Sequence, residues 1–261
     1  MSIANGRMPA LFLGHGNPMN AIDSNAYTAA WVELAAHLPR PAAILSVSAH
    51  WYVPGSRVTV GQHPRTIHDF GGFPRALYEV AYPAPGDPEL AQRARGMLAP
   101  TQVIADETWG LDHGTWSLLV HLYPDADVPV VQLSIDETLT AGQHFDLGGR
   151  LRALRDEGVL ILGSGNVVHN LHAYAWGAHA VAPYDWAIDF ESRLRQLIET
   201  RQFASVAGYE GSPEAALVAP TPDHFLPLLY VLAQAEPDDA LAFPVEGFDG
   251  GSISMLGVRV G

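Results

Sequence analysis

Residues 44–51 read ILSVSAHW, an apolar run that ends in a histidine and a tryptophan. A short run of this kind, over residues 42–48, predicts a strand buried on both faces, as in a parallel sheet covered by helices. His50 follows this run, at the point where the strand is expected to leave the core. Ligands of open α/β sheets bind beyond the carboxyl ends of the strands, so this histidine is a candidate site residue.

The same alternation of strands and helices continues on both sides of this stretch. Further strands are predicted at residues 9–13, 57–60, 102–105, 128–135, 159–162 and 252–260. Helices are predicted from Asp23 or Ser24 to His37 and at residues 87–98, 114–122, 140–157, 184–201 and 222–235. This order predicts an α/β fold with a mostly parallel central sheet and helices on both faces. Because no repeat or linker interrupts it, residues 1–261 are expected to form a single domain.

Composition excludes several classes of protein. The chain has 261 residues, of which 48% are hydrophobic, enough for a large core. Its net charge is -14 with only 14 Lys and Arg, whereas proteins that bind the nucleic-acid backbone need clustered basic residues. The chain has no apolar run near the roughly 20 residues that span a bilayer, and its N-terminus does not resemble a signal peptide. We expect a cytoplasmic protein with no nucleic-acid or membrane partner, and a homo-oligomer is left open.

The chain contains no cysteine and 12 histidines. Disulfides, thiolate metal sites and a cysteine nucleophile are therefore excluded. Any metal ion has to be held by histidine, aspartate or glutamate.

Four histidines are predicted at strand tips or helix starts. His15 follows the first strand, His50 the second, and His169 the strand that ends in VLILGSG, while His224 opens the helix predicted at residues 222–235. A single histidine at such a place is more often a hydrogen-bonded structural residue. Four of them favour a metal site, because neutral imidazoles bind zinc, iron and copper.

Two further segments carry candidate residues with two interpretations each. In GLDHGTW, Asp112 either orients the imidazole of His113 or caps a helix. His68 and Asp69 lie in the long loop that contains HDFGGFP. They either line a pocket together with Phe70 and Phe73 or only hold the loop in its conformation. The remaining histidines are expected to be surface or core residues: His37, His63, His121, His144, His172 and His179.

The glycine-rich segment GSGNVVHN invites comparison with a phosphate-binding turn. It lacks both the full G-x-G-x-x-G pattern and the Lys and Ser of a P-loop, and it does not match the G-x-S-x-G elbow of serine hydrolases. Gly163 and Gly165 are instead expected to permit a close approach to a neighbouring strand or to the site.

Six motifs occur in order: FLGHGNPM, SVSAHW, HDFGGFP, LDHGTWSLL, GSGNVVHNL and PTPDHFLPLLY. As a set they resemble the DODA-type extradiol aromatic ring-opening dioxygenases, a branch of the LigB superfamily. The resemblance extends from about His15 to Tyr230 and implies one catalytic α/β domain with a metal ion in a cleft.

The resemblance also implies roles for the histidines. His15 and His50 match metal ligands, and His224 occupies the region of the third ligand, with Asp223 as the alternative. His169 matches the histidine assigned to acid–base catalysis, which lies close enough in this branch to count as a fourth ligand. His113 matches a second catalytic histidine of the pocket.

The implied reaction is the opening of a catechol-type ring, DOPA-like in this branch, by O₂ at Fe(II), with Zn(II) possible in its place. The alternatives are a zinc-dependent hydrolase or another non-oxygenase metalloenzyme on the same scaffold, and a relative that binds metal without activity. The catechol itself stays open. Candidates for packing on its ring are Phe70, Phe73 and Trp51, and candidates for binding a carboxylate are Arg57, Arg65 and Arg75.

Overall fold

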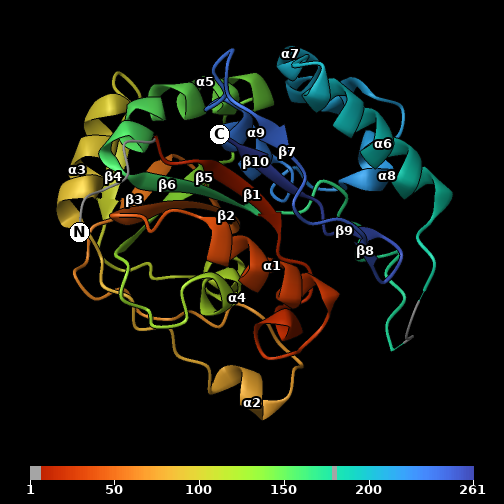
Figure 1. The fold of residues 1–261 in the computed structure, drawn as a ribbon, viewed down its shortest axis with the longest axis horizontal. Helices are drawn as coiled ribbons and strands as arrows, with labels where there is room; N and C mark the ends of the chain where they lie inside the picture. Colours follow the sequence, from red (N-terminus) through yellow and green to blue (C-terminus); the bar gives the residue numbers. More distant parts are fainter. Residues whose placement is uncertain (1–6, 178–180) are drawn as a thin grey trace.

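The computed structural model describes residues 7–177 and 181–261, so His179 lies outside the described residues. An eight-stranded sheet with the order β4-β3-β5-β2-β6-β1-β10-β7 forms the centre (Figure 1). Its strands are β1 Ala10–Gly14, β2 Ala43–Val53, β3 Ser56–Thr59, β4 Val103–Asp106, β5 Val130–Asp136, β6 Val159–Gly165, β7 Leu241–Ala242 and β10 Gly257–Val260. The four central strands β5, β2, β6 and β1 are mutually parallel, while β3, β10 and β7 join by antiparallel pairings.

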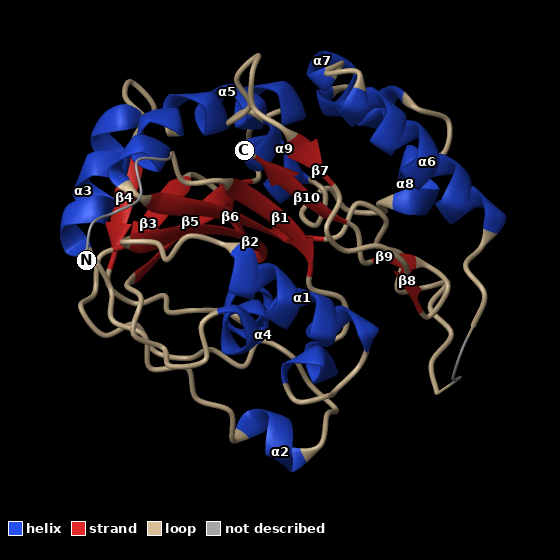
Figure 2. Cartoon of the chain, viewed as in Figure 1, coloured by secondary structure: helices blue, strands red, loops and turns tan. Residues whose placement is uncertain are grey.

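Helices cover both faces of the sheet (Figure 2). One face carries α3 Pro88–Met97, α5 Ala141–Arg150 and α9 Leu226–Leu232, with α6 Asp185–Glu199 and α7 Phe203–Ala207 beside them. The other face carries α1 Ala26–His37 and α4 His113–Leu122. The short helices α2 Arg75–Tyr78 and α8 Ala215–Val218 lie in the connections. The predicted fold class is confirmed.

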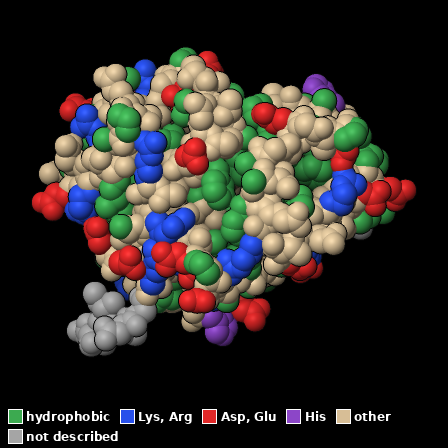
Figure 3. Space-filling view, turned by 90° about the horizontal axis from the view of Figure 1, so that it is seen from above, with side chains coloured by type: hydrophobic (Ala, Val, Ile, Leu, Met, Phe, Trp, Pro, Cys, Tyr) green, Lys and Arg blue, Asp and Glu red, His purple; other side chains and the backbone are tan. Residues whose placement is uncertain are grey.

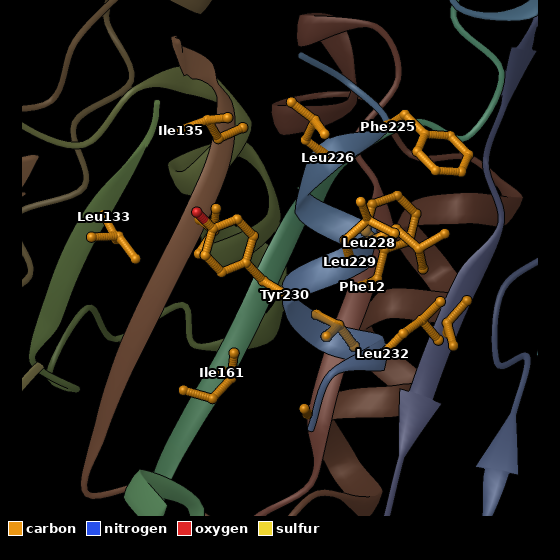
Figure 4. Packing of buried hydrophobic residues seen from close by; sticks show 14 of the residues in the cluster. Phe12, Leu133, Ile135, Ile161, Phe225, Leu226, Leu228, Leu229, Tyr230 and Leu232 are labelled. Atoms are coloured by element: carbon orange, nitrogen blue, oxygen red, sulfur yellow. The ribbon is translucent and has the colours of Figure 1, made fainter. Parts of the chain in front are cut away.

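Helix α9 is buried on every side because all seven of its residues are apolar or aromatic (Figure 4). It packs against β6, β1 and β2. A Cβ on Gly163 of β6 would stand 2.6 Å from the carbonyl oxygen of Pro227, so the helix can approach the sheet this closely only over a glycine. The glycine does permit a close approach, but the partner is helix α9 rather than the expected neighbouring strand or site.

Several predicted boundaries were wrong for local reasons. Asn25, rather than Asp23 or Ser24, caps α1, because its side chain accepts from the backbone N–H groups of Tyr27 and Thr28. The helix predicted at residues 140–157 is divided into α5 and the 3₁₀ helix Arg152–Glu157. The glycine pair at the end of α5 has low helix propensity, which favours a break there.

The chain after α6 also differs from the prediction. Residues 252–260 form two strands, of which β9 Ile253–Ser254 pairs with β8 Phe248–Asp249 in a separate ribbon, while β10 pairs antiparallel to β1. Helix α9 begins at Leu226, where Pro227 favours a helix start, so His224 lies in the turn before it instead of opening it. Within the described ranges, no helix is both long and apolar enough to cross a membrane.

Candidate metal centre

Three central strands deliver histidines to the same edge of the sheet. His15 directly follows β1, and the segment after β6 carries His169. His50 lies inside β2 rather than after it, since β2 continues to Val53. The pairing of β2 with β5 shifts register between Val47 and Tyr52, and this irregularity surrounds His50. Such breaks re-aim side chains, which explains how a strand residue faces the site.

The rings of His15, His50 and His224 are evenly spaced. Their centroids lie 4.9 Å apart for His15 and His50, 5.3 Å for His15 and His224, and 5.0 Å for His50 and His224. The Nε2 atoms of His15 and His50 are 3.0 Å apart. Two imidazoles on one ion, with metal–nitrogen distances of 2.0–2.1 Å, have centroids about 4.5–5.3 Å apart. All three spacings fall within that window.

His113 and His169 join this group at shorter ring distances. Candidate ligand atoms of His15, His50 and His113 all lie within 4.8 Å of one another. The His113 centroid, however, is 3.8 Å from that of His50, and the His169 ring stacks on His224 at 3.5 Å with an interplanar angle of 5°. These two ring pairs are closer than the spacing expected for two ligands of one ion.

Hydrogen bonds at Nδ1 determine which nitrogen each ring presents. The Nδ1 atom of His15 lies 3.0 Å from Ser164 Oγ, which donates its own proton to the carbonyl of Gly114 and therefore accepts from His15. His224 Nδ1 lies 2.5 Å from a carboxylate oxygen of Asp223. Both rings thus carry their proton on Nδ1 and present an unprotonated Nε2, the form that binds metals.

A second carboxylate, Asp69, lies beside both His50 and His113. Its Oδ2 lies 3.2 Å from His50 Nδ1 and 3.0 Å from His113 Nδ1. Asp112, the other candidate for orienting His113, instead caps α4 by accepting from the N–H of Thr115. The capping interpretation of Asp112 is therefore confirmed, and the orienting carboxylate comes from the loop motif HDFGGFP.

Burial keeps the imidazoles neutral. It lowers the pKa of His15 and of His50 well below the ordinary value, and neighbouring imidazoles lower both further. The same causes lower the pKa of His169 to about 2. Although burial raises the pKa of Asp223, the bond from His224 brings it down to about 2, so this carboxylate is charged. Neutral imidazoles oriented by carboxylates are suited to a divalent cation.

The histidines line a cavity of about 200 Å³. Besides the five histidines its wall is largely apolar and aromatic, with Phe70, Phe73, Leu171, Tyr174, Trp176 and Ile253. Trp51, expected to pack on a substrate ring, is outside this lining and stacks on Trp109 with a centroid distance of 5.2 Å. The cavity therefore places flat aromatic side chains beside the five histidines, and this arrangement suits an aromatic ring with polar substituents.

The arginines proposed for a substrate carboxylate do not line this cavity. Arg57 pairs with Asp106, Arg75 pairs with Glu79, and Arg65 is exposed on the long loop. On the face shown in Figure 3, the basic side chains, which are all arginines in this chain, lie scattered among Asp and Glu. The structure thus gives no support to carboxylate binding by these three residues.

Gly165, at the end of β6, permits the close approach expected for it. A Cβ on this residue would overlap the carbonyl oxygen of His224, and that carbonyl accepts a 2.9 Å hydrogen bond from the N–H of Asn166. The strand end and the turn that carries His224 are therefore packed backbone to backbone.

Gly165→Ala is expected to destabilise the protein by about 1–3 kcal/mol, the usual cost of overpacking, and to weaken metal binding by displacing His224. Urea unfolding and zinc titration measure the two effects. Gly96→Ala is the matched control, because its added methyl group meets nothing within 4 Å on α3. Equal stability and zinc affinity of the Gly165→Ala and Gly96→Ala variants would contradict the packing described here.

Comparison with known proteins agrees with this geometry. The family model described as the catalytic LigB subunit of aromatic ring-opening dioxygenase matches residues 10–249. The chain belongs to the LigB family. Members of this family are metal-dependent extradiol ring-cleaving enzymes, so the chain is an oxidoreductase of that class. The resemblance drawn from the six motifs is confirmed.

Individual LigB relatives match nearly the whole chain. A protein of Escherichia coli strain K12 named 4,5-DOPA dioxygenase extradiol is 50% identical over 262 residues, which cover 98% of this chain and 95% of the relative. A protein of the same name from Beta vulgaris is 39% identical over 251 residues, covering 93% and 92%. A crystal structure of an uncharacterized protein from Escherichia coli K12 superimposes with a TM-score of 0.86 at 46% identity, covering 98% of this chain and 100% of that one.

Proposed function

We propose that the chain opens the ring of a DOPA-like catechol with O₂, using Fe(II) held by His15, His50 and His224. The observation that carries the ligand assignment is the set of three ring spacings between 4.9 and 5.3 Å. The substrate class is supported by relatives named 4,5-DOPA dioxygenase extradiol and by the aromatic wall of the cavity.

The third ligand in this proposal is His224 rather than Asp223. Asp223 accepts from Nδ1 of His224, and this bond leaves Nε2 as the ring nitrogen available to an ion. The donors are therefore three neutral imidazoles, a set that suits both Fe(II) and Zn(II). We assign iron as the catalytic metal because ring opening by O₂ requires a redox-active ion, with zinc able to occupy the same site.

A ferrous ion, when bound, supplies open positions for a diol and O₂ and lowers the pKa of the coordinated hydroxyl. The protein supplies the proton acceptor. His169 lines the cavity and no hydrogen bond among the described residues holds its side chain, so a ring nitrogen is left to accept a hydroxyl proton from the substrate. Its stacking on His224 at 3.5 Å would have to widen before His169 could also serve as a fourth ligand.

His113 acts from the other side of the cavity. Its Nδ1 bonds to Asp69, so its Nε2 is the ring nitrogen left to hydrogen-bond a substrate oxygen. Phe70 and Phe73 orient the ring and limit access of water.

Anaerobic reconstitution with Fe(II), followed by a catechol and air, tests the proposed function. Oxygen uptake with a yellow ring-opened semialdehyde is the expected result. Hydrolysis with zinc and no oxygen uptake would instead support the zinc-dependent alternative, and metal binding without either activity would support a silent relative. A panel of catechols on the iron-loaded protein then identifies the substrate.

We further propose that residues 1–261 work as one catalytic domain in the cytoplasm. A cysteine-free acidic chain is consistent with that compartment. Homo-oligomerisation stays a prediction, which size-exclusion chromatography with light scattering checks.

A further inference from the structure

The motif HDFGGFP lies in the long connection between β3 and α3, at the mouth of the cavity. The backbone of Asp69 is exposed there, but its side chain is only 17% exposed because it points inward to the histidines. A surface loop thus sends one carboxylate into the metal centre.

Two hydrogen bonds and one close polar contact converge on this carboxylate. Oδ2 accepts from Nδ1 of His113 at 3.0 Å, Oδ1 accepts from the backbone N–H of His113 at 2.9 Å, and Nδ1 of His50 lies 3.2 Å from Oδ2. A carboxylate oxygen accepts in such a bond, so the His113 ring donates from Nδ1 and leaves its Nε2 for the cavity.

We propose that Asp69 is a positioning residue that orients His50 and His113 together and presents both Nε2 atoms to the metal centre. The inference rests on the proposed metal centre and assigns no direct contact between Asp69 and an ion. Outer carboxylates of this kind orient the ring and raise the basicity of a metal-binding histidine. Here one oxygen lies beside two histidines from different elements, the proposed ligand His50 of β2 and the cavity residue His113 of α4.

The same residue connects the metal centre to the wall of the cavity. The ring of Phe70 meets His113 edge-on, with a centroid distance of 5.4 Å and an interplanar angle of 83°. Phe73 packs edge-on against Phe70 at 5.4 Å. Asp69 and the aromatic wall are thus connected through His113, while Phe70 also packs against Tyr78 and Trp116.

Asp69→Asn is the decisive variant because it keeps the size of the side chain. An amide has one oxygen and one NH₂ group, so either orientation turns a donor toward a donor. Asp239→Asn is the matched control: its side chain is 16% exposed and pairs with Arg155, whose guanidinium also bonds to Met8 before β1, at the opposite end of the sheet. Both variants lose a shielded carboxylate, but only the first faces the histidines.

Zinc affinity, measured against a competing chelator on metal-free protein, is the readout. We expect a 10–100-fold loss for Asp69→Asn and no change for Asp239→Asn. The visible spectrum of Co(II)-substituted protein should shift only in Asp69→Asn. Urea unfolding of the metal-free variants shows that both are folded.

Wild-type zinc affinity and an unchanged Co(II) spectrum in Asp69→Asn would overturn the inference, whatever its turnover. Equal loss of affinity in both variants would also overturn it, because the loss of any shielded carboxylate would then weaken zinc binding. If the wild-type protein itself failed to bind zinc, the proposed metal centre would be wrong instead.

Discussion

Replacing His50 with alanine is expected to abolish metal binding and, with it, ring opening, while the α/β fold persists. The variant removes one of three proposed ligands and leaves the carboxylate of Asp69 facing the vacated space. The loss of affinity should exceed the roughly 100-fold limit typical of outer-shell partners. His15→Ala is expected to behave in the same way, because its Nε2 lies 3.0 Å from that of His50.

Metal analysis after dialysis against Fe(II) or zinc, together with far-UV circular dichroism, checks this prediction. His63→Ala is the matched control, because this histidine is exposed and outside the cavity lining. Full metal occupancy in both His15→Ala and His50→Ala would refute the ligand assignment. Loss of the fold in either variant would be recognised from its circular dichroism spectrum, and the remaining variant would then decide.

His169→Ala should lower kcat by roughly 10²–10⁴-fold, the usual cost of removing a general base. Substrate affinity should change less, because the aromatic wall that contacts the ring is untouched. Steady-state kinetics of the iron-loaded protein measure both quantities, with the exposed neighbour His172→Ala as the control.

Metal content separates the two roles open to His169. If the residue is a base only, occupancy stays at the wild-type level while turnover falls. If it is also a ligand, occupancy falls together with turnover. Wild-type turnover in His169→Ala would remove this residue from the mechanism.

The fold followed from local patterns. Apolar runs separated by amphipathic segments predicted the parallel centre, and the histidines at its strand ends could be named from their places after those runs. Apart from the cap of α1 and the break after α5, the errors lay in what local pattern does not encode. Examples are the antiparallel β10, which depends on pairing with β1 across the whole chain, and the short separate ribbon of β8 and β9.

The partners of the histidines were harder to predict, because they come from distant parts of the sequence. Ser164 lies 149 residues from His15, and Asp69 lies 44 residues from His113. Asp112, adjacent to His113, was the more obvious candidate in sequence, yet its carboxylate is used at the helix start. The only local signal for Asp69 was its place in a long histidine-rich loop.

A crystal structure of the protein grown anaerobically with Fe(II) tests the central claim most directly. The account predicts one ion per chain, at about 2.0–2.2 Å from the Nε2 atoms of His15, His50 and His224, with its open positions facing the aromatic wall. An ion bound elsewhere, or bound at this edge of the sheet without two or more of these three nitrogens, would contradict it.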